Sequence, residues 1–235
     1  MPSLLNSAAG AAQLASAGSA SDQSLITDHG SRITVRRLGL VDYLPTWEAM
    51  RTFTAARTPI TPDELWLLQH RPIYTYGVAG RPEHLPAAGS SIPVLKVDRG
   101  GQVTYHGPGQ IVLYTLLDLR RRQLTVRGLV ERLEQAVLDL LSQYEVRAQR
   151  RTGAPGVYVG NAKIAALGLR VSRGCSYHGL SLNVDADLEP FQAIDPCGYP
   201  GLAVTCTRDL GLNASAEILG AELVKTVGEQ LSTRA

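Results

Sequence analysis

The order of strand-like and helix-like segments is the feature that most limits the folds open to this chain. Apolar or alternating stretches predict strands over 32–38, 64–69, 73–76, 93–97, 110–117 and 177–184, with a hairpin of 156–159 and 163–169 around Gly160-Asn161. Apolar residues at helical spacing predict helices over 44–57, 125–144 and 215–231, the second with Thr125 as N-cap. Because the helices do not alternate strictly with the strands, the pattern predicts an α+β fold, a sheet covered by helices, and not a doubly wound sheet.

The two ends of the chain differ in composition. Residues 1–30 are rich in Ala, Ser and Gly, and the first 23 residues contain neither Lys nor Arg, so we expect a disordered tail without a targeting signal. The rest, 31–235, is expected to be one domain, since no linker or repeat interrupts it.

Charge and cysteine content exclude several classes of protein. The net charge of +2 gives no electrostatic argument for nucleic-acid binding, and no apolar run is long enough for a membrane helix. Cysteines stand at Cys175, Cys197 and Cys206. Their odd number and wide spacing predict free thiols, which suit a reducing cytoplasm.

A glycine-rich segment, RGGQVTYHGPGQ over 99–110, is the first candidate site. Glycine lets a backbone approach a ligand closely and leaves N–H groups to point at it. The segment matches neither the phosphate-binding loop nor the dinucleotide fingerprint. A tight hairpin with turn glycines is the alternative interpretation.

Two reactive side chains stand in unusual surroundings. Lys163 lies in an otherwise apolar segment, where a strand lysine with its ammonium in water is the plainer interpretation. Cys197 lies between Pro196 and Gly198, in a bend and not in a packed strand, although most free cysteines are small apolar fillers. Cys175 and Cys206 fit that filler role better.

A thiol and an amine together suit acyl transfer. Only the thiolate is a strong nucleophile, and a neighbouring ammonium lowers the thiol pKa. The amine can then take a proton from an attacking nucleophile. Backbone N–H groups near Gly198 or in the glycine-rich segment are candidate donors to the oxyanion.

Four stretches carry a resemblance to a known family. RGGQVTYHGPGQ (99–110), KIAALGLRVSRGCSYHGLSLNV (163–184), PCGYPG (196–201) and WLLQHRPIYTYGVAGRPEHL (66–85) resemble the octanoyltransferases of lipoate biosynthesis. The resemblance implies a biotin/lipoate protein ligase-like fold with one mixed β-sheet flanked by helices. It places the family's nucleophile on Cys197 and its general acid–base on Lys163. It also implies an acyl-binding pocket formed by Arg99, Gly100, Gly101, Gln102, Val103, Thr104, Tyr105, His106, Ala166, Leu167, Gly168, Gly179, Leu180 and Ser181.

The same resemblance implies the substrates. The donor would be octanoyl-acyl carrier protein, and the acceptors would be lysines of lipoyl domains in 2-oxo acid dehydrogenase E2 subunits and of glycine cleavage H protein. Neither a cofactor nor a metal is expected, and no ATP is needed because one thioester is exchanged for another.

Alternative functions stay open at this point. An ATP-dependent lipoate or biotin ligase of the same fold would activate a free acid, but no GRGRxGRxW stretch is present and Cys197 would be idle. An amidotransferase would take octanoyl from another lipoyl domain. A zinc-binding module would use His106, Cys175, His178, Cys197 and Cys206, which lack two compact ligand pairs. A non-catalytic homologue that only binds carrier protein would be expected to lack Cys197 or Lys163.

Overall fold

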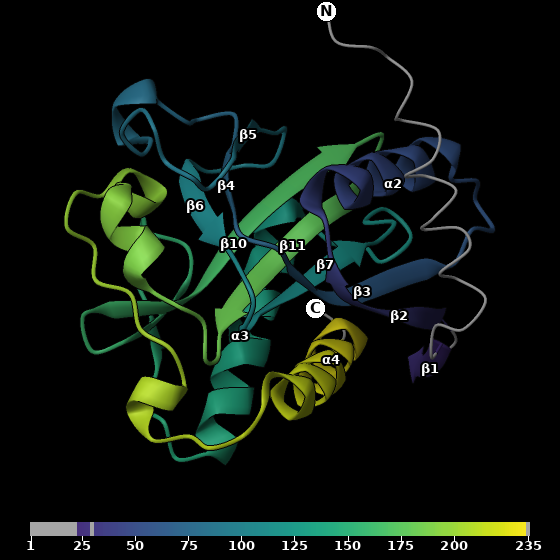
Figure 1. Ribbon diagram of the computed structural model, residues 1–235. Helices are drawn as coiled ribbons and strands as arrows, with labels where there is room; N and C mark the ends of the chain where they lie inside the picture. Colours follow the sequence, from purple (N-terminus) through teal and green to yellow (C-terminus); the bar gives the residue numbers. More distant parts are fainter. Residues whose placement is uncertain (1–22, 29–30, 234–235) are drawn as a thin grey trace, which may run out of the picture.

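A mixed β-sheet of eight strands forms the centre of the computed structural model, which describes residues 23–28 and 31–233 (Figure 1). Its strand order is β1-β2-β3-β7-β11-β10-β9-β8, with β2 and β3 parallel and the other neighbours antiparallel. The strands are β1 (Gln23–Asp28), β2 (Ser31–Val41), β3 (Asp63–His70), β7 (Gln110–Leu116), β8 (Gln149–Arg150), β9 (Val157–Val159), β10 (Ala162–Ser172) and β11 (Cys175–Asn183).

A second, smaller sheet carries most of the glycine-rich segment. Within the described residues it consists of β5 (Val94–Lys96), β4 (Ile73–Tyr76) and β6 (Val103–His106), in that order. Tyr74, Val103 and Tyr105 pack on its buried side with Phe191 and Ile194. The segment after the main-sheet strand β11 therefore lies against this small sheet.

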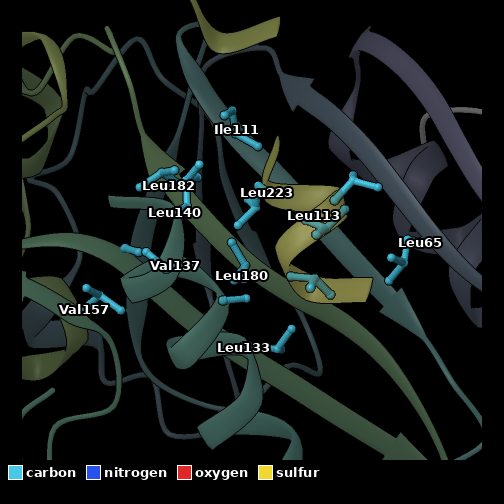
Figure 2. Close-up of a cluster of buried hydrophobic side chains, with 14 of the residues drawn as sticks. Leu65, Ile111, Leu113, Leu133, Val137, Leu140, Val157, Leu180, Leu182 and Leu223 are labelled. Atoms are coloured by element: carbon cyan, nitrogen blue, oxygen red, sulfur yellow. The ribbon is translucent and has the colours of Figure 1, made fainter. Parts of the chain in front are cut away.

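Helices cover both faces of the main sheet, as Figure 1 shows. On one face lie α3 (Val126–Gln143) and α4 (Ala216–Ser232), and on the other lies α2 (Tyr43–Ala56). In Figure 2, side chains of α3 and α4 meet leucines of β7 and β11 in the larger core; the labelled residues include Leu133, Val137, Leu140, Leu223, Leu113, Leu180 and Leu182. Met50 of α2 packs on Trp66 and Tyr114 in the smaller one.

Capping residues explain where two helices begin. The Thr125 hydroxyl accepts a hydrogen bond from the N–H of Gly128 at 3.0 Å, and the Ser215 hydroxyl accepts one from Ile218 at 3.3 Å. Each satisfies a backbone donor that the first helical turn leaves without a partner. Short 3₁₀ turns follow β4 and β11: η2 (Pro82–His84), η3 (Glu189–Ala193), η4 (Pro196–Gly198) and η5 (Arg208–Leu210).

Most predicted elements are confirmed to within a few residues. The three predicted helices are α2, α3 and α4, and the predicted hairpin is β9 and β10. The α+β, mixed-sheet fold is likewise confirmed. Strand β6 was not predicted, because its partner β4 lies far away in the sequence.

The N-terminal region differs in part from expectation. Residues 23–28, placed in the predicted tail, form the edge strand β1 on β2. The remainder of that tail, residues 1–22 and 29–30, lies outside the described residues. Among the helices that the structure describes, none has the length and apolar character needed to cross a bilayer.

Candidate active site

A cavity lies where the glycine-rich segment meets β10 and β11. Its lining includes twelve of the fourteen residues predicted for the acyl pocket: Arg99, Gly101, Gln102, Val103, Thr104, His106, Ala166, Leu167, Gly168, Gly179, Leu180 and Ser181. The glycine-rich segment and the paired strands β10 and β11, which are far from it in the sequence, thus meet at one cavity. Its remaining walls come from Tyr43 of α2, from Val112 and Tyr114 of β7 and from His178 of β11.

The other two predicted pocket residues do not line this cavity. Gly100 fixes the glycine-rich segment to β10, because its N–H donates to the carbonyl of Leu169 at 2.8 Å. Tyr105 packs instead with Tyr74 and Phe191 in the core of the small sheet. Both residues hold the segment in place from outside the cavity.

Lys163 lines a smaller adjoining pocket. The lining of this pocket includes Lys163, Pro196, Gln110 and Asn183, and it shares Thr104, Ala166 and Ser181 with the larger cavity. The Lys163 side chain is only 3% exposed, which rejects the interpretation of a strand lysine with its ammonium in water. Its Nζ donates to the carbonyl oxygen of Pro155 at 3.1 Å and lies 5.1 Å from the centre of the Tyr158 ring.

Cys197 lies in the turn η4, between Pro196 and Gly198. Its side chain is outside the part of the molecule that the structure describes. The N–H of Gly198 donates to the Asp195 carbonyl at 2.9 Å, and the N–H of Tyr199 donates to the Pro196 carbonyl at 3.2 Å. The Gly198 N–H proposed for the oxyanion is therefore engaged within the turn itself.

Gly198 is required by its surroundings. Its φ of +76° lies in the left-handed region, and a Cβ added there would lie 2.1 Å from Nε2 of Gln102. The carboxamide of Gln102 therefore packs directly on the backbone beside Cys197. This contact joins the glycine-rich segment to the PCGY motif.

A ladder of buried amides links the glycine-rich segment to β10 and β11. The Gln110 side chain is hydrogen-bonded through both of its polar atoms. Its Oε1 accepts a bond from Nδ1 of His106 at 2.7 Å, and its Nε2 donates to Oδ1 of Asn183 at 2.9 Å. Asn183 in turn donates through Nδ2 to the carbonyl of Thr205 at 3.0 Å. The N–H of Thr205 donates to the Lys163 carbonyl at 3.0 Å. These bonds fix the relative positions of β6, β7, β11 and β10.

A half-buried carboxylate, Asp98, is hydrogen-bonded to His178, a residue of the cavity wall. Asp98 accepts hydrogen bonds from Trp47 at 2.8 Å, Tyr177 at 2.5 Å and His178 at 3.0 Å. Burial acts to raise the pKa of Asp98, but these three hydrogen bonds outweigh it and hold the pKa well below its ordinary value. Burial lowers the pKa of His178, in spite of its contact with Asp98.

Burial also keeps His70 and His106 neutral near pH 7. It lowers the pKa of His70 to about 4 and that of His106 well below its ordinary value. His70 Nε2 lies 2.7 Å from the hydroxyl of Tyr114, and its Nδ1 lies 3.1 Å from the carbonyl of Val41. Because a carbonyl only accepts, His70 donates from Nδ1 and accepts the Tyr114 hydroxyl proton at Nε2. His106 lines the cavity and His70 bonds Tyr114, which also lines it; as neutral rings of lowered pKa, both are poor candidates for a general base.

Sequence reasoning missed the far wall of the cavity. This wall is formed by residues outside the quoted motifs: Tyr43 in α2, and Val112 and Tyr114 in β7. The sequence did contain one indication: Tyr114 lies within the apolar run QIVLYTLL, and a buried tyrosine hydroxyl needs a hydrogen-bond partner in the interior. Gln110 and Asn183 lie at or next to the ends of two of the quoted motif stretches, but nothing local indicated their bond.

The remaining cysteines fit filler positions. Cys206 is fully buried and Cys175 half-buried, and burial raises the pKa of both thiols. No group of three or more His, Cys, Asp or Glu side chains that could hold a metal ion occurs within residues 23–28 and 31–233.

A family model and curated relatives match most of this chain. Residues 42–225 match the model of the lipoyl protein ligase A/B catalytic domain. An octanoyltransferase of Thiobacillus denitrificans is 66% identical over 79% of this chain and 84% of its own length. An octanoyltransferase of Dechloromonas aromatica is 58% identical over 85% of this chain and 97% of its own length.

Solved structures share the fold at low sequence identity. A lipoate protein ligase of T. acidophilum with bound lipoic acid has a TM-score of 0.67 and 15% identity, covering 84% of this chain and 85% of that one. A biotin protein ligase of Aquifex aeolicus, solved with biotin and ATP, has a TM-score of 0.54 and 14% identity, covering 84% of this chain and 69% of that one. These likenesses establish the architecture alone.

Proposed function

Because the chain belongs to the lipoyl protein ligase A/B catalytic domain family and is an acyltransferase, we propose that it transfers an octanoyl group from acyl carrier protein to a lysine of a lipoyl domain. The acyl group is carried on Cys197 as a thioester, and Lys163 serves as the general acid and base. One observation supports this proposal most: Lys163 is buried in a pocket that is also lined by Pro196, the residue before Cys197.

The first half-reaction moves the acyl group to the enzyme. Lys163 as an ammonium lowers the pKa of the Cys197 thiol and favours the thiolate. The thiolate attacks the carbonyl carbon of the octanoyl thioester, and the sulfur of the carrier protein leaves. Lys163 gives its proton to that leaving thiolate, so the products are acyl-Cys197, a free carrier thiol and a neutral Lys163 amine.

The second half-reaction forms the amide. A neutral lysine amine of the lipoyl domain attacks the Cys197 thioester, and Lys163 accepts the proton that the new amide nitrogen loses. Cys197 leaves as a thiolate, which restores the starting thiolate–ammonium pair. An amide is more stable than a thioester, so the step runs downhill without ATP.

The larger cavity is the proposed site for the octanoyl chain. It adjoins the Lys163 pocket through Thr104, Ala166 and Ser181, so a chain attached at Cys197 would run along β10 and β11. Its histidines are held neutral by burial, which suits an uncharged ligand. Cytoplasmic location, the E2 lipoyl domains and the glycine cleavage H protein belong to the same proposal, and no cofactor is required.

A test of donor choice separates this function from its nearest rival. The purified chain is incubated with an unmodified lipoyl domain and either octanoyl-carrier protein without ATP or octanoate with ATP. The proposal predicts a lipoyl domain heavier by one octanoyl group in the first mixture only. Transfer in the second mixture with release of AMP would identify an ATP-dependent ligase instead.

A further inference from the structure

Glu134 of α3 is a buried carboxylate that the proposed reaction does not use. Glu134 is only 5% exposed to solvent. Acidic side chains are rarely buried unless they are paired. One oxygen, Oε1, accepts the backbone N–H of Gly156 at 2.8 Å, and the other, Oε2, accepts Nε of Arg150 at 3.1 Å. Glu134 thus fixes the loop between β8 and β9.

The same loop contacts the tip of Lys163. Nζ of Lys163 donates to the carbonyl of Pro155 at 3.1 Å. Gly156 has a φ of +136°, and a Cβ added there would lie 3.0 Å from Cε and 3.3 Å from Nζ of Lys163. The backbone of residues 155 and 156 therefore packs against the end of the Lys163 side chain.

A single peptide group connects the two contacts. The carbonyl of Pro155 and the N–H of Gly156 belong to the same planar peptide unit and point in opposite directions. Glu134 holds its N–H end, and Lys163 is bound at its C=O end. A carboxylate bonded to the N–H also increases the negative charge on the carbonyl oxygen, which strengthens its bond to an ammonium.

From this connection we propose that Glu134 is a positioning residue that fixes the Lys163 ammonium by orienting the Pro155–Gly156 peptide. The inference rests on the proposed role of Lys163 as the partner of Cys197. Without Glu134 the Pro155–Gly156 peptide loses the bond that orients it, the contact between the Lys163 ammonium and the Pro155 carbonyl weakens, and the thiolate of Cys197 is less favoured.

Other charged groups lie around Glu134 and Lys163 and also act on the electrostatic potential there. Arg150 bonds Glu134 and also donates to the carbonyl of Glu131 and to the side chain of Gln135. The guanidinium of Arg151 lies 4.3 Å from the centre of the Tyr158 ring, which Lys163 also contacts. On the side of η4, Asp195 is paired with His84 at 2.8 Å.

The test is the pH dependence of Cys197 alkylation by iodoacetamide, measured on the full chain by peptide-resolved mass spectrometry. Lys163→Ala gives the reference shift of the midpoint to higher pH. Glu134→Ala removes the carboxylate, and Glu134→Asp makes it one methylene too short to reach Gly156. Each is expected to raise the midpoint by about 0.5–1 pH unit, which corresponds to roughly three- to tenfold less Cys197 thiolate at pH 7. Glu134→Gln keeps an oxygen within reach of Gly156, and its midpoint is expected to lie closer to that of the wild type.

Glu131→Asp is the matched control. It shortens an exposed carboxylate by one methylene almost one turn away on the same helix, where Glu131 pairs with Arg127, and its midpoint is expected to equal that of the wild type. If Glu134→Ala does not fold, the aspartate and glutamine variants decide the matter.

The outcomes separate the two proposals. A shift in Lys163→Ala with none in Glu134→Asp overturns the role of Glu134 alone. So does a glutamine variant shifted as far as the aspartate variant. No shift in Lys163→Ala contradicts the proposed Cys197–Lys163 pair itself.

Discussion

Lys163 forms an isolated parallel β-bridge with Val204. The Lys163 N–H donates to the Ala203 carbonyl at 2.8 Å, and the Thr205 N–H donates to the Lys163 carbonyl at 3.0 Å. These bonds join β10 to the segment that follows the PCGY motif. They explain why the candidate base and the turn that carries the candidate nucleophile lie together, although long stretches of sequence separate them.

The buried amide of Asn183 supports this junction. Asn183→Ala removes the side-chain donor to the Thr205 carbonyl and one of the two acceptors of Gln110 Nε2, which keeps its bond to the Tyr105 carbonyl. We expect the free energy of unfolding to fall by about 1–3 kcal/mol, the cost of leaving buried polar groups without partners. Urea titration followed by circular dichroism measures it. Asn213→Ala, at an exposed position, should change it by no more than about 0.5 kcal/mol; equal losses in both variants would contradict the role of the ladder.

Two glycines with similar backbone angles offer a matched pair. Gly198 has a φ of +76° and its Cβ would collide with Gln102, whereas Gly201 has a φ of +70° with nothing within 4 Å. Both alanine variants bear the cost of a left-handed conformation, but only Gly198→Ala displaces the carboxamide of Gln102. Single-turnover octanoyl transfer should fall about tenfold or more in Gly198→Ala relative to Gly201→Ala. Similar rates in the two variants would remove Gln102 from the account.

Ala166 lines both the Lys163 pocket and the larger cavity. A leucine there fills the junction between them, so a long acyl chain should be excluded more than a short one. We expect Ala166→Leu to lower the ratio of octanoyl to butyryl transfer by about tenfold or more, as added methylenes in a filled pocket do. Competition between octanoyl- and butyryl-carrier protein measures this ratio directly. An unchanged ratio would place the acyl chain elsewhere.

Stability should fall as the pH drops below neutrality. The pKa of folded His70 is about 4, below the value of about 6.5 in the unfolded chain. Between these values the unfolded state binds more protons, so the stability present above pH 6.5 is lost towards pH 4, by up to about 1.4 kcal/mol per pH unit. Urea titrations at pH 7 and pH 5 check this. His70→Gln should show a shallower loss, and an unchanged slope would mean that His70 does not contribute.

Local signals were sufficient for the long elements. The period of apolar residues and the hydroxyl of Thr125 define α3, and Gly160-Asn161 defines the β9–β10 hairpin. Strand β6 could not be read in the same way, because its glycine-rich surroundings indicate a loop and its pairing with β4 is long-range. The role of Gly198 likewise depends on Gln102, which no local pattern brings near it.

The candidate site shows the same division. The motifs predicted the strands that line the cavity, yet Tyr43 and Tyr114 enter from α2 and β7 through packing alone. Glu134 was one of several carboxylates on a helix, and only its contact with Gly156 distinguishes it. The assignment of residues 31–235 as one catalytic domain, and the roles of Cys197 and Lys163, stay predictions.

The most direct test of the account is the site at which the enzyme itself becomes acylated. The full chain is mixed with octanoyl-carrier protein without an acceptor, digested and mapped by mass spectrometry. We predict one octanoyl group on Cys197, removed by neutral hydroxylamine as a thioester should be, and unaffected by Cys206→Ser. Octanoyl transfer to a lipoyl domain at the wild-type rate by Cys197→Ser would contradict the account.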